Sequence, residues 1–278
     1  MRLTYCQLYI VTLLFCAQQA YSQQSARPRL AALDDHISEV RLDRGYVTVG
    51  GATIEDAVTL ARTFVAFPIC LELIDYDPKR DAMTVHDAIE RLRKLQITHP
   101  LSGAETALLQ SYETLQSEGA SSRIVGYKKT TFTLIRHDIS VRNYLNEIVS
   151  LDTKYRWMNY GTTERPLIVV EPRTESALSW NVSGLCDREP MIAEDLFGTN
   201  GEVTRQFKAH SIIRVAMGSR ELLAGVLVKS NFCDGVVTAR DLLNRISDAA
   251  PKTLSWSLSG IKGLRWLEFQ LASDTNGY

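Results

Sequence analysis

Three stretches of the chain place apolar residues one, four, five and eight positions after a Thr or Ser. The three hydroxyl residues are Thr53, Ser140 and Thr238. This spacing gathers the apolar side chains on one face of an amphipathic helix. The preceding hydroxyl is a typical N-cap, because its oxygen accepts a hydrogen bond from a free N–H of the first turn. The pattern therefore predicts a helix beginning directly after each of the three residues.

Strand-like segments flank these predicted helices. A short strand is expected before each helix, and a second strand follows the cap by 17 or 18 residues, marked by Leu71, Trp157 and Trp256. The second and third stretches add a hairpin partner, over 167–170 and 264–269. Each unit thus reads strand, capped helix, strand, with a further strand in two cases. This self-similarity indicates either an internal repeat or the shared packing pattern of unrelated α/β segments.

Two more helices are expected between the first and second units. Thr84 and Ser102 each stand three residues before an acidic residue, which is the pattern of a capping box. The predicted fold class is α+β, with small mixed sheets packed against capped helices. The predicted organisation is a flexible segment over 23–40, a first subdomain over 41–172 with a helical insert at 84–118, and a second subdomain over 173–278.

The first 22 residues have the pattern of a secretory signal peptide. Arg2 precedes the apolar run 8–17, and Ala20 and Ser22 are the small residues expected before a cleavage site. The run is shorter than the roughly 20 apolar residues of a membrane-spanning helix. The sequence therefore predicts cleavage near Ser22 and a periplasmic or extracellular mature chain without a membrane span. The alternative is an uncleaved membrane anchor.

Export determines how the cysteines are interpreted. The mature chain would keep Cys70, Cys186 and Cys233, which allows at most one intramolecular disulfide. Cys70 lies in an apolar run and is predicted to be a buried thiol. Cys186 and Cys233 lie in polar, turn-like segments and are the candidate disulfide, with two unpaired thiols as the alternative.

Composition and motifs exclude several classes of function. The chain has 278 residues, 45% of them hydrophobic and 23% charged, which is an ordinary globular composition. Its net charge of -1 argues against a nucleic-acid-binding protein. The sequence contains no nucleophile elbow, zinc-protease, Walker or dinucleotide-binding motif. It therefore predicts no catalytic residues, no cofactor and no metal site.

Two weaker patterns have a possible functional role and an ordinary structural one. Asp75, Asp77, Asp81 and Asp87 have a spacing that oxygen ligands of calcium can show, but the cations of the segment 78–80 interrupt them. These aspartates are interpreted as a solvated loop.

Aromatic residues at 155–157 and 264–266 are candidate ligand platforms. Trp157 and Trp256, however, occupy equivalent strand positions and are predicted to be core residues. Arg156 and Arg265 would then point outward as solvated charges.

The second unit reads FTLIRHDISVRNYLNEIVSLDTKYRWMNYG at 132–161 and LIVVEP at 167–172. This pattern resembles the short N-terminal domain of secretins and TonB-dependent receptors. Together with VGGATIEDAVTLARTF and PICLEL earlier in the chain, it is also similar to uncharacterised secreted bacterial proteins built on that pattern. The similarity covers 45–75 and 130–172, with a weaker echo at 226–270. It implies a fold, an exported context and a docking role, and brings no catalytic residues.

These observations favour a non-enzymatic binding protein of the bacterial envelope, secreted or periplasmic. It would dock a protein or peptide partner through an exposed strand edge or helix face. The alternatives are a secreted hydrolase with a dispersed active site and an accessory factor of an envelope secretion or assembly complex. A hydrolase should show a deep pocket with convergent polar groups, and a docking protein should show a shallow patch or an open edge.

Overall fold

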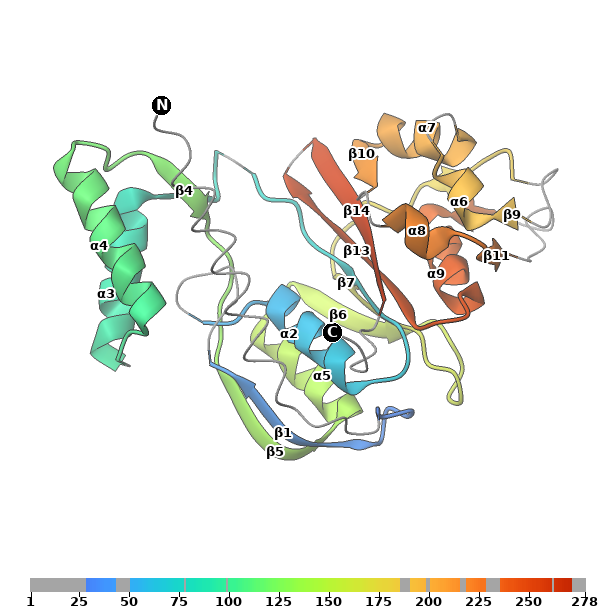
Figure 1. Cartoon of the computed structure of the whole chain (residues 1–278), viewed down its shortest axis with the longest axis horizontal. Coiled ribbons are helices and arrows are strands. Elements are labelled where there is room, and N and C mark those ends of the chain that lie inside the picture. The colour runs from blue at the N-terminus through green and yellow to red at the C-terminus, as the bar shows by residue number, and fades with distance from the viewer. Residues whose placement is uncertain are drawn as a thin grey trace. The chain divides into compact units, whose positions relative to one another are not determined.

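A computed structural model describes residues 29–43, 51–77, 79–98, 100–185, 191–198, 201–215, 219–228, 236–261 and 263–271. The predicted signal peptide, Cys186 and Cys233 lie outside these residues. Within them the chain has the predicted α+β fold, with a six-stranded mixed sheet, four two-stranded sheets and helices packed against them (Figure 1). None of the described helices combines the length and apolar character that a membrane span requires.

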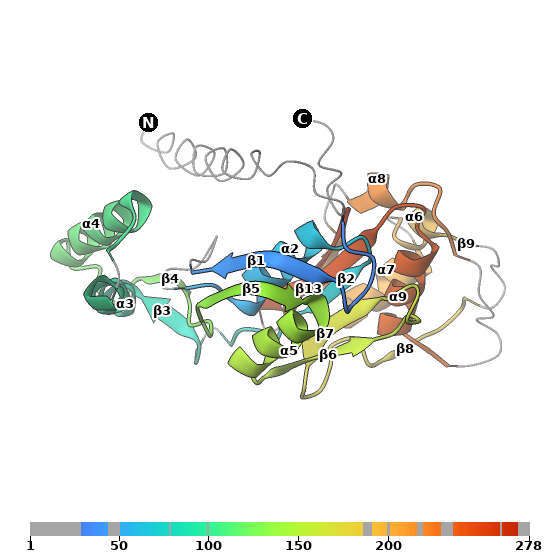
Figure 2. The same ribbon diagram turned by 90° about the horizontal axis from the view of Figure 1, so that it is seen from below.

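The six-stranded sheet joins strands from distant parts of the chain. Its order is β10 (Ile212–Val215), β14 (Leu264–Leu271), β13 (Leu254–Ile261), β2 (Ile69–Glu72), β7 (Ile168–Pro172) and β6 (Tyr155–Asn159). β2 runs parallel to both β13 and β7, whereas β6–β7 and β13–β14 are antiparallel hairpins. Figure 2 shows β6 at the border of this sheet.

Helices cover both faces of the sheet. On one face lie α2 (Ile54–Phe64) and α5 (Val141–Leu151), and their buried side chains form one hydrophobic cluster with β2, β6 and β7. The other face carries α6 (Ala193–Leu196), α7 (Glu202–Ala209), α8 (Ser219–Leu223) and α9 (Ala239–Ala249), packed mainly against β13 and β14. Residues on both sides of the predicted boundary at 172/173 therefore supply strands to one sheet, while each side supplies the helices of one face.

The predicted N-caps are confirmed. The side-chain oxygens of Thr53, Ser140 and Thr238 accept hydrogen bonds from the N–H groups three residues later, at 3.1–3.2 Å. In α2 and α9 an aspartate completes a capping box. The three helices begin where the sequence predicts, because the local apolar spacing and the cap chemistry agree.

Two of the units share further contacts that no local pattern revealed. The first two N–H groups of α5 donate to carbonyls just before β1 (His36–Leu42), and those of α9 donate to carbonyls just before β8 (Asn181–Val182). The donor and acceptor pairs are Val141 and Asp35, Arg142 and Leu33, Ala239 and Trp180, and Arg240 and Leu178.

A tryptophan bonds to the same helix position in both units. Trp157 Nε1 donates to Asn146 Oδ1 at 2.9 Å, and Trp256 Nε1 donates to Asn244 Oδ1 at 3.1 Å. Each asparagine stands six residues after its cap. The two predicted core tryptophans thus occupy corresponding places, although Trp256 is fully buried and Trp157 only partly.

The strand preceding each of these helices is paired. β1 is antiparallel to β5 (Leu134–Ser140), and β8 is antiparallel to β12 (Val237–Thr238). This arrangement differs from the flexible segment predicted over 23–40, because residues 36–40 belong to β1 and bury Ile37 and Val40. The partner strand β5 lies about a hundred residues later in the chain. The local sequence of 23–40 therefore gave no sign that this segment forms a paired strand.

Between the first two units the chain forms a helical hairpin on a two-stranded ribbon. β3 (Ala82–Thr84) leads into α3 (Val85–Thr98), followed by α4 (Gly103–Ser117) and β4 (Ile124–Tyr127), which pairs with β3. The predicted capping boxes at Thr84 and Ser102 are present. This part has its own small core, formed by Val85, Ile89, Leu92 and Leu109. A further short pair joins β9 (Met191–Ile192) and β11 (Leu227–Val228).

Candidate functional site

Two glutamates lie buried side by side where β2 and β7 end. The parallel register pairs Leu71 with Val170, which brings Glu72 beside Glu171, and both are 0% exposed. Arg240, in the first turn of α9, bonds to both carboxylates. Its Nη2 lies 2.8 Å from Glu72 Oε2, and its Nη1 lies 2.5 Å from Glu171 Oε2.

The remaining carboxylate oxygens are also occupied. Arg156 Nε donates to Glu171 Oε1 at 2.8 Å, and the Tyr160 hydroxyl donates to Glu171 Oε2 at 3.2 Å. Glu72 accepts from the Ser176 hydroxyl at 2.8 Å and from the N–H of residue 177 at 2.6 Å. Two arginines thus balance two carboxylates, and every carboxylate oxygen has at least one donor.

The electrostatics of this cluster favour the charged state of Arg240. Burial alone would lower the pKa of the guanidinium, but the carboxylates of Glu72 and Glu171 outweigh it and raise that pKa. A carboxylate pair that is saturated by fixed donors has no free oxygen for a substrate or a proton transfer. We therefore interpret the cluster as a structural lock, which joins α9 to strands β2, β6 and β7 and holds β6 at the sheet border.

The outer edge of β6 presents unpaired backbone groups. Tyr160 N–H donates to Leu167 C=O, so the antiparallel pattern directs residues 156, 158 and 160 toward β7. The N–H and C=O groups of Trp157 and Asn159 consequently point away from the sheet. Within the described part of the chain, no strand pairs with this edge.

Side chains at this edge combine apolar surface with positive charge. Met158 is 43% exposed and Tyr160 is 42% exposed, both on the α9 side of the sheet. Near the start of β6, Arg173 Nε donates to Tyr155 C=O at 2.9 Å, which occupies that carbonyl. Lys154 and Arg173 are exposed there. The β6 edge, defined by residues 154–160, therefore offers two backbone positions between an apolar patch and a cationic end.

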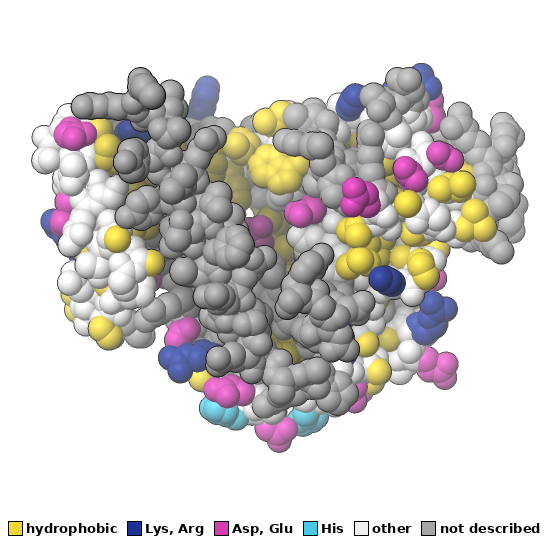
Figure 3. Space-filling view, viewed as in Figure 1, with side chains coloured by type: hydrophobic (Ala, Val, Ile, Leu, Met, Phe, Trp, Pro, Cys, Tyr) yellow, Lys and Arg dark blue, Asp and Glu magenta, His cyan; other side chains and the backbone are white. Residues whose placement is uncertain are grey.

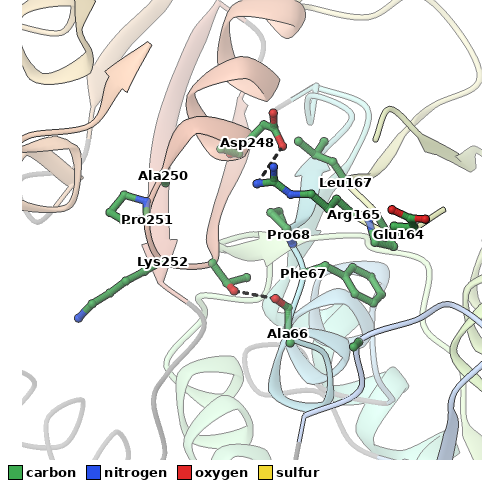
Figure 4. A pocket seen from close by; sticks show the side chains of 14 residues that line it. Ala66, Phe67, Pro68, Glu164, Arg165, Leu167, Asp248, Ala250, Pro251 and Lys252 are labelled. Atoms are coloured by element: carbon green, nitrogen blue, oxygen red, sulfur yellow. Dashed lines mark hydrogen bonds and ion pairs between the residues drawn. The ribbon is translucent and has the colours of Figure 1, made fainter. Parts of the chain in front are cut away.

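A separate hollow of about 300 Å³ lies at the amino ends of β2, β7 and β13 (Figure 4). Its floor includes Pro68 and Leu167, and its rim includes Arg165 and Asp248, whose charged atoms are 3.8 Å apart. Both of these side chains are largely exposed, so water screens their charges. Figure 4 shows Lys252 extending away from the other labelled side chains. The charged groups on the rim of the hollow are therefore solvated, and Ser247 is a buried polar residue in its lining.

The structure places the sequence-predicted cysteines and aspartates as follows. Cys70 is a buried free thiol as predicted, with Sγ 4.0 Å from Ser247 Oγ, and burial raises its pKa to about 11. The candidate disulfide between Cys186 and Cys233 lies outside the described residues. Two of the predicted solvated aspartates have structural partners: the Asp87 carboxylate accepts from the Thr84 N–H at 3.0 Å and completes the capping box of α3, and Asp75 pairs with Arg265. No cluster of three or more potential metal ligands occurs among the residues that the structure describes.

The prediction that Arg156 and Arg265 are simply solvated charges is wrong. Arg156 pairs with Glu171, and Arg265 pairs with Asp75 with an N–O distance of 2.6 Å. Glu171 lies across the β6–β7 hairpin from Arg156, and Asp75 is distant in sequence from Arg265. The alternation of side chains along a strand reveals neither pairing. Conversely, Glu72 and Glu171 were not identified from the sequence. Their only local signal is a carboxylate within an otherwise apolar strand, which at that depth requires a partner.

Comparisons with known proteins assign no family. The chain matches no family model, no curated protein and no solved structure. The geometry of the cluster, the hollow and the β6 edge therefore supplies the evidence on function.

Proposed function

We propose that the chain is a non-enzymatic binding protein of the bacterial envelope, periplasmic or secreted, that docks an extended peptide segment of a partner protein along β6. The observation that carries the proposal is the open edge of β6, with two outward backbone positions at Trp157 and Asn159. An added strand would bond to these groups and extend the six-stranded sheet. A docking role is also what the resemblance of 130–172 to the short N-terminal domain implies.

The surroundings of the edge favour a particular kind of segment. Met158 and Tyr160 would contact apolar side chains on one face of the added strand, because both expose apolar surface beside the edge. Lys154 and Arg173 would attract an acidic residue at one end. The partner segment is thus expected to be extended, apolar on one face and acidic beside Lys154.

The edge is also rigid enough to serve as a template. Arg156 and Tyr160 tie β6 to the buried Glu171 and, through it, to Arg240 of α9. Trp157 fastens the opposite face of β6 to α5 through Asn146. A strand fixed on both faces loses little conformational freedom when a peptide joins it, which favours binding.

The test compares two substitutions at one position. Trp157→Pro removes the outward N–H, while Trp157→Ala keeps it and removes the same indole. Proline is compatible with an edge position whose N–H faces away from the sheet. Tagged mature protein of each kind would be used to capture partners from the native envelope fraction, with circular dichroism to verify folding.

The proposal expects one stoichiometric partner that is retained by Trp157→Ala and lost with Trp157→Pro. Photocrosslinking from position 158 should then map to an extended segment of that partner. Equal capture by the two folded variants, or crosslinks to a helical surface only, would contradict docking at β6. Turnover of an added hydrolase substrate by the purified chain would instead support the hydrolase alternative.

A further inference from the structure

One face of the β13–β14 hairpin has a composition unlike the rest of the sheet. On one face, alternate residues of the hairpin are buried in the hydrophobic cluster that includes helices α6 to α9. These residues are Leu254, Trp256, Leu258, Leu267 and Phe269. The cluster on the opposite side of the sheet contains no buried residue of β13 or β14. The second face of this hairpin therefore lacks the apolar packing that covers its neighbours β2 and β7.

The side chains on that face pair across the hairpin in a regular order. Ser257 lies opposite Glu268, Ser259 opposite Trp266, and Ile261 opposite Leu264. Serines along β13 leave a low surface beside the larger side chains of β14. Trp266 is 39% exposed, which is unusual for so large an aromatic residue. Together these residues form the serine–tryptophan face, defined as 257, 259, 261, 264, 266 and 268.

Several polar groups on this face have capacity to bind a ligand. The hydroxyl of Ser259, the carboxylate of Glu268 and the indole N–H of Trp266 make no hydrogen bond or ion pair with other described residues. At the inner end of the face, Arg62 is held by neutral acceptors: it donates to Ser257 Oγ at 2.9 Å and to Gln270 Oε1 at 2.7 Å. Figure 3 shows hydrophobic and acidic side chains exposed together over the upper ends of β13 and β14.

We infer that the serine–tryptophan face binds a neutral oligosaccharide. A pyranose ring has one face of C–H groups, which suits the electron-rich face of an indole, and a rim of hydroxyls, which suits serine and carboxylate groups. Glu268 is the only charged side chain that β13 and β14 themselves direct onto this face. The nearby cation of Arg62 is buried and already donates to four protein acceptors, so the Glu268 carboxylate is the charge left to accept from hydroxyl donors and to repel anionic ligands.

This site goes beyond the proposed docking of a peptide and is separate from it. The face lies on β13 and β14, whereas the β6 edge is at the border of the sheet beyond β2 and β7. Loss of one binding activity should therefore leave the other intact, and each proposal fails or stands by its own variants.

The experiment is a calorimetric titration of the mature chain with three neutral probes: chitohexaose, cellohexaose and maltohexaose. A heparin hexasaccharide serves as the anionic comparison. Trp266→Ala removes the stacking surface, and Ser259→Leu fills the low part of the face without touching the core. Tyr112→Leu, in α4, is a matched loss of an aromatic ring elsewhere.

We expect at least one neutral hexasaccharide to bind and the anionic one not to bind. Trp266→Ala should weaken binding by at least about tenfold, Ser259→Leu should abolish it, and Tyr112→Leu should leave it unchanged. Binding of none of the neutral probes up to about 10 mM would overturn the inference. So would preferential binding of heparin, or full affinity in both face variants when circular dichroism shows them folded.

Discussion

Removing Arg240 from the buried cluster should be one of the most damaging single changes in this chain. Arg240 bonds to Glu72 and Glu171, which are both fully buried, and its own side chain is only slightly exposed. With Arg156 included, the cluster holds two negative and two positive charges. Arg240→Met keeps most of the side-chain volume and leaves one uncompensated negative charge in the interior.

The magnitude follows from the cost of an unpaired buried charge. Breaking a buried ion pair by removing one partner typically costs about 3–5 kcal/mol. Water barely reaches the two carboxylates, so solvent screening does not reduce this cost. The double variant Glu72→Gln/Arg240→Met restores a neutral cluster, since one carboxylate and Arg156 then remain. It should therefore lose less free energy of unfolding than Arg240→Met alone.

Urea denaturation followed by circular dichroism measures both differences. Arg165→Met is the control, because Arg165 belongs to an exposed pair with Asp248 and should change the free energy of unfolding by less than about 0.5 kcal/mol. A loss below about 1 kcal/mol for Arg240→Met would refute the structural lock, given the range expected for buried pairs. A double variant less stable than the single one would refute the charge-balance reasoning.

Other predictions concern single residues. Because burial raises the pKa of Cys70 to about 11, iodoacetamide should leave the Cys70 peptide unmodified in folded protein at about pH 8 and alkylate it after denaturation, as peptide mass spectrometry would show. Asn244→Ala should cost about 1–3 kcal/mol of unfolding free energy in urea, because it strands a buried indole N–H, whereas the equivalent Asn146→Ala should cost clearly less at its more exposed site. Thr238→Ala should cost about 1 kcal/mol by removing the cap of α9, and a shift in urea midpoint of Thr238→Ala no larger than that of Thr238→Ser would contradict this. Hydrogen bonds from Arg80 and the backbone lower the pKa of Asp81 to about 2, so any stability that Asp81 adds over Asp81→Asn should be present above about pH 4 and should fade as the pH falls toward 2 in thermal melts.

Local patterns predicted the helices well, because helix formation depends on neighbours within a few residues. Thr53, Ser140 and Thr238 stand directly before the observed helices, and Ser102 completes the box that begins α4. The hairpin strands after α5 and α9 were also predicted, since each follows its helix by a short turn. The α+β class follows from these elements alone.

The candidate sites depended on pairings that local patterns do not encode. Glu72 and Arg240 are 168 residues apart, and they meet only because β2 lies between β13 and β7. The open edge of β6 likewise follows from the strand order. The same five residues would have a strand on each side if they lay in the interior of the sheet. Trp266 illustrates the limit: the sequence marked 264–266 as a candidate ligand platform, but it did not show which face of the hairpin the helices would cover.

The central place of β2 has a consequence for how the chain folds. Leu71 of β2 pairs with Ser257 of β13 on one side and with Val170 of β7 on the other. During synthesis the apolar strand β2 therefore lacks its partner β13 until nearly two hundred further residues have been added to the chain. Contacts of such long sequence separation slow folding and leave intermediates prone to aggregation. The β13–β14 hairpin thus acts as the closing step of the fold, and truncation before it should yield an insoluble product rather than a smaller stable domain.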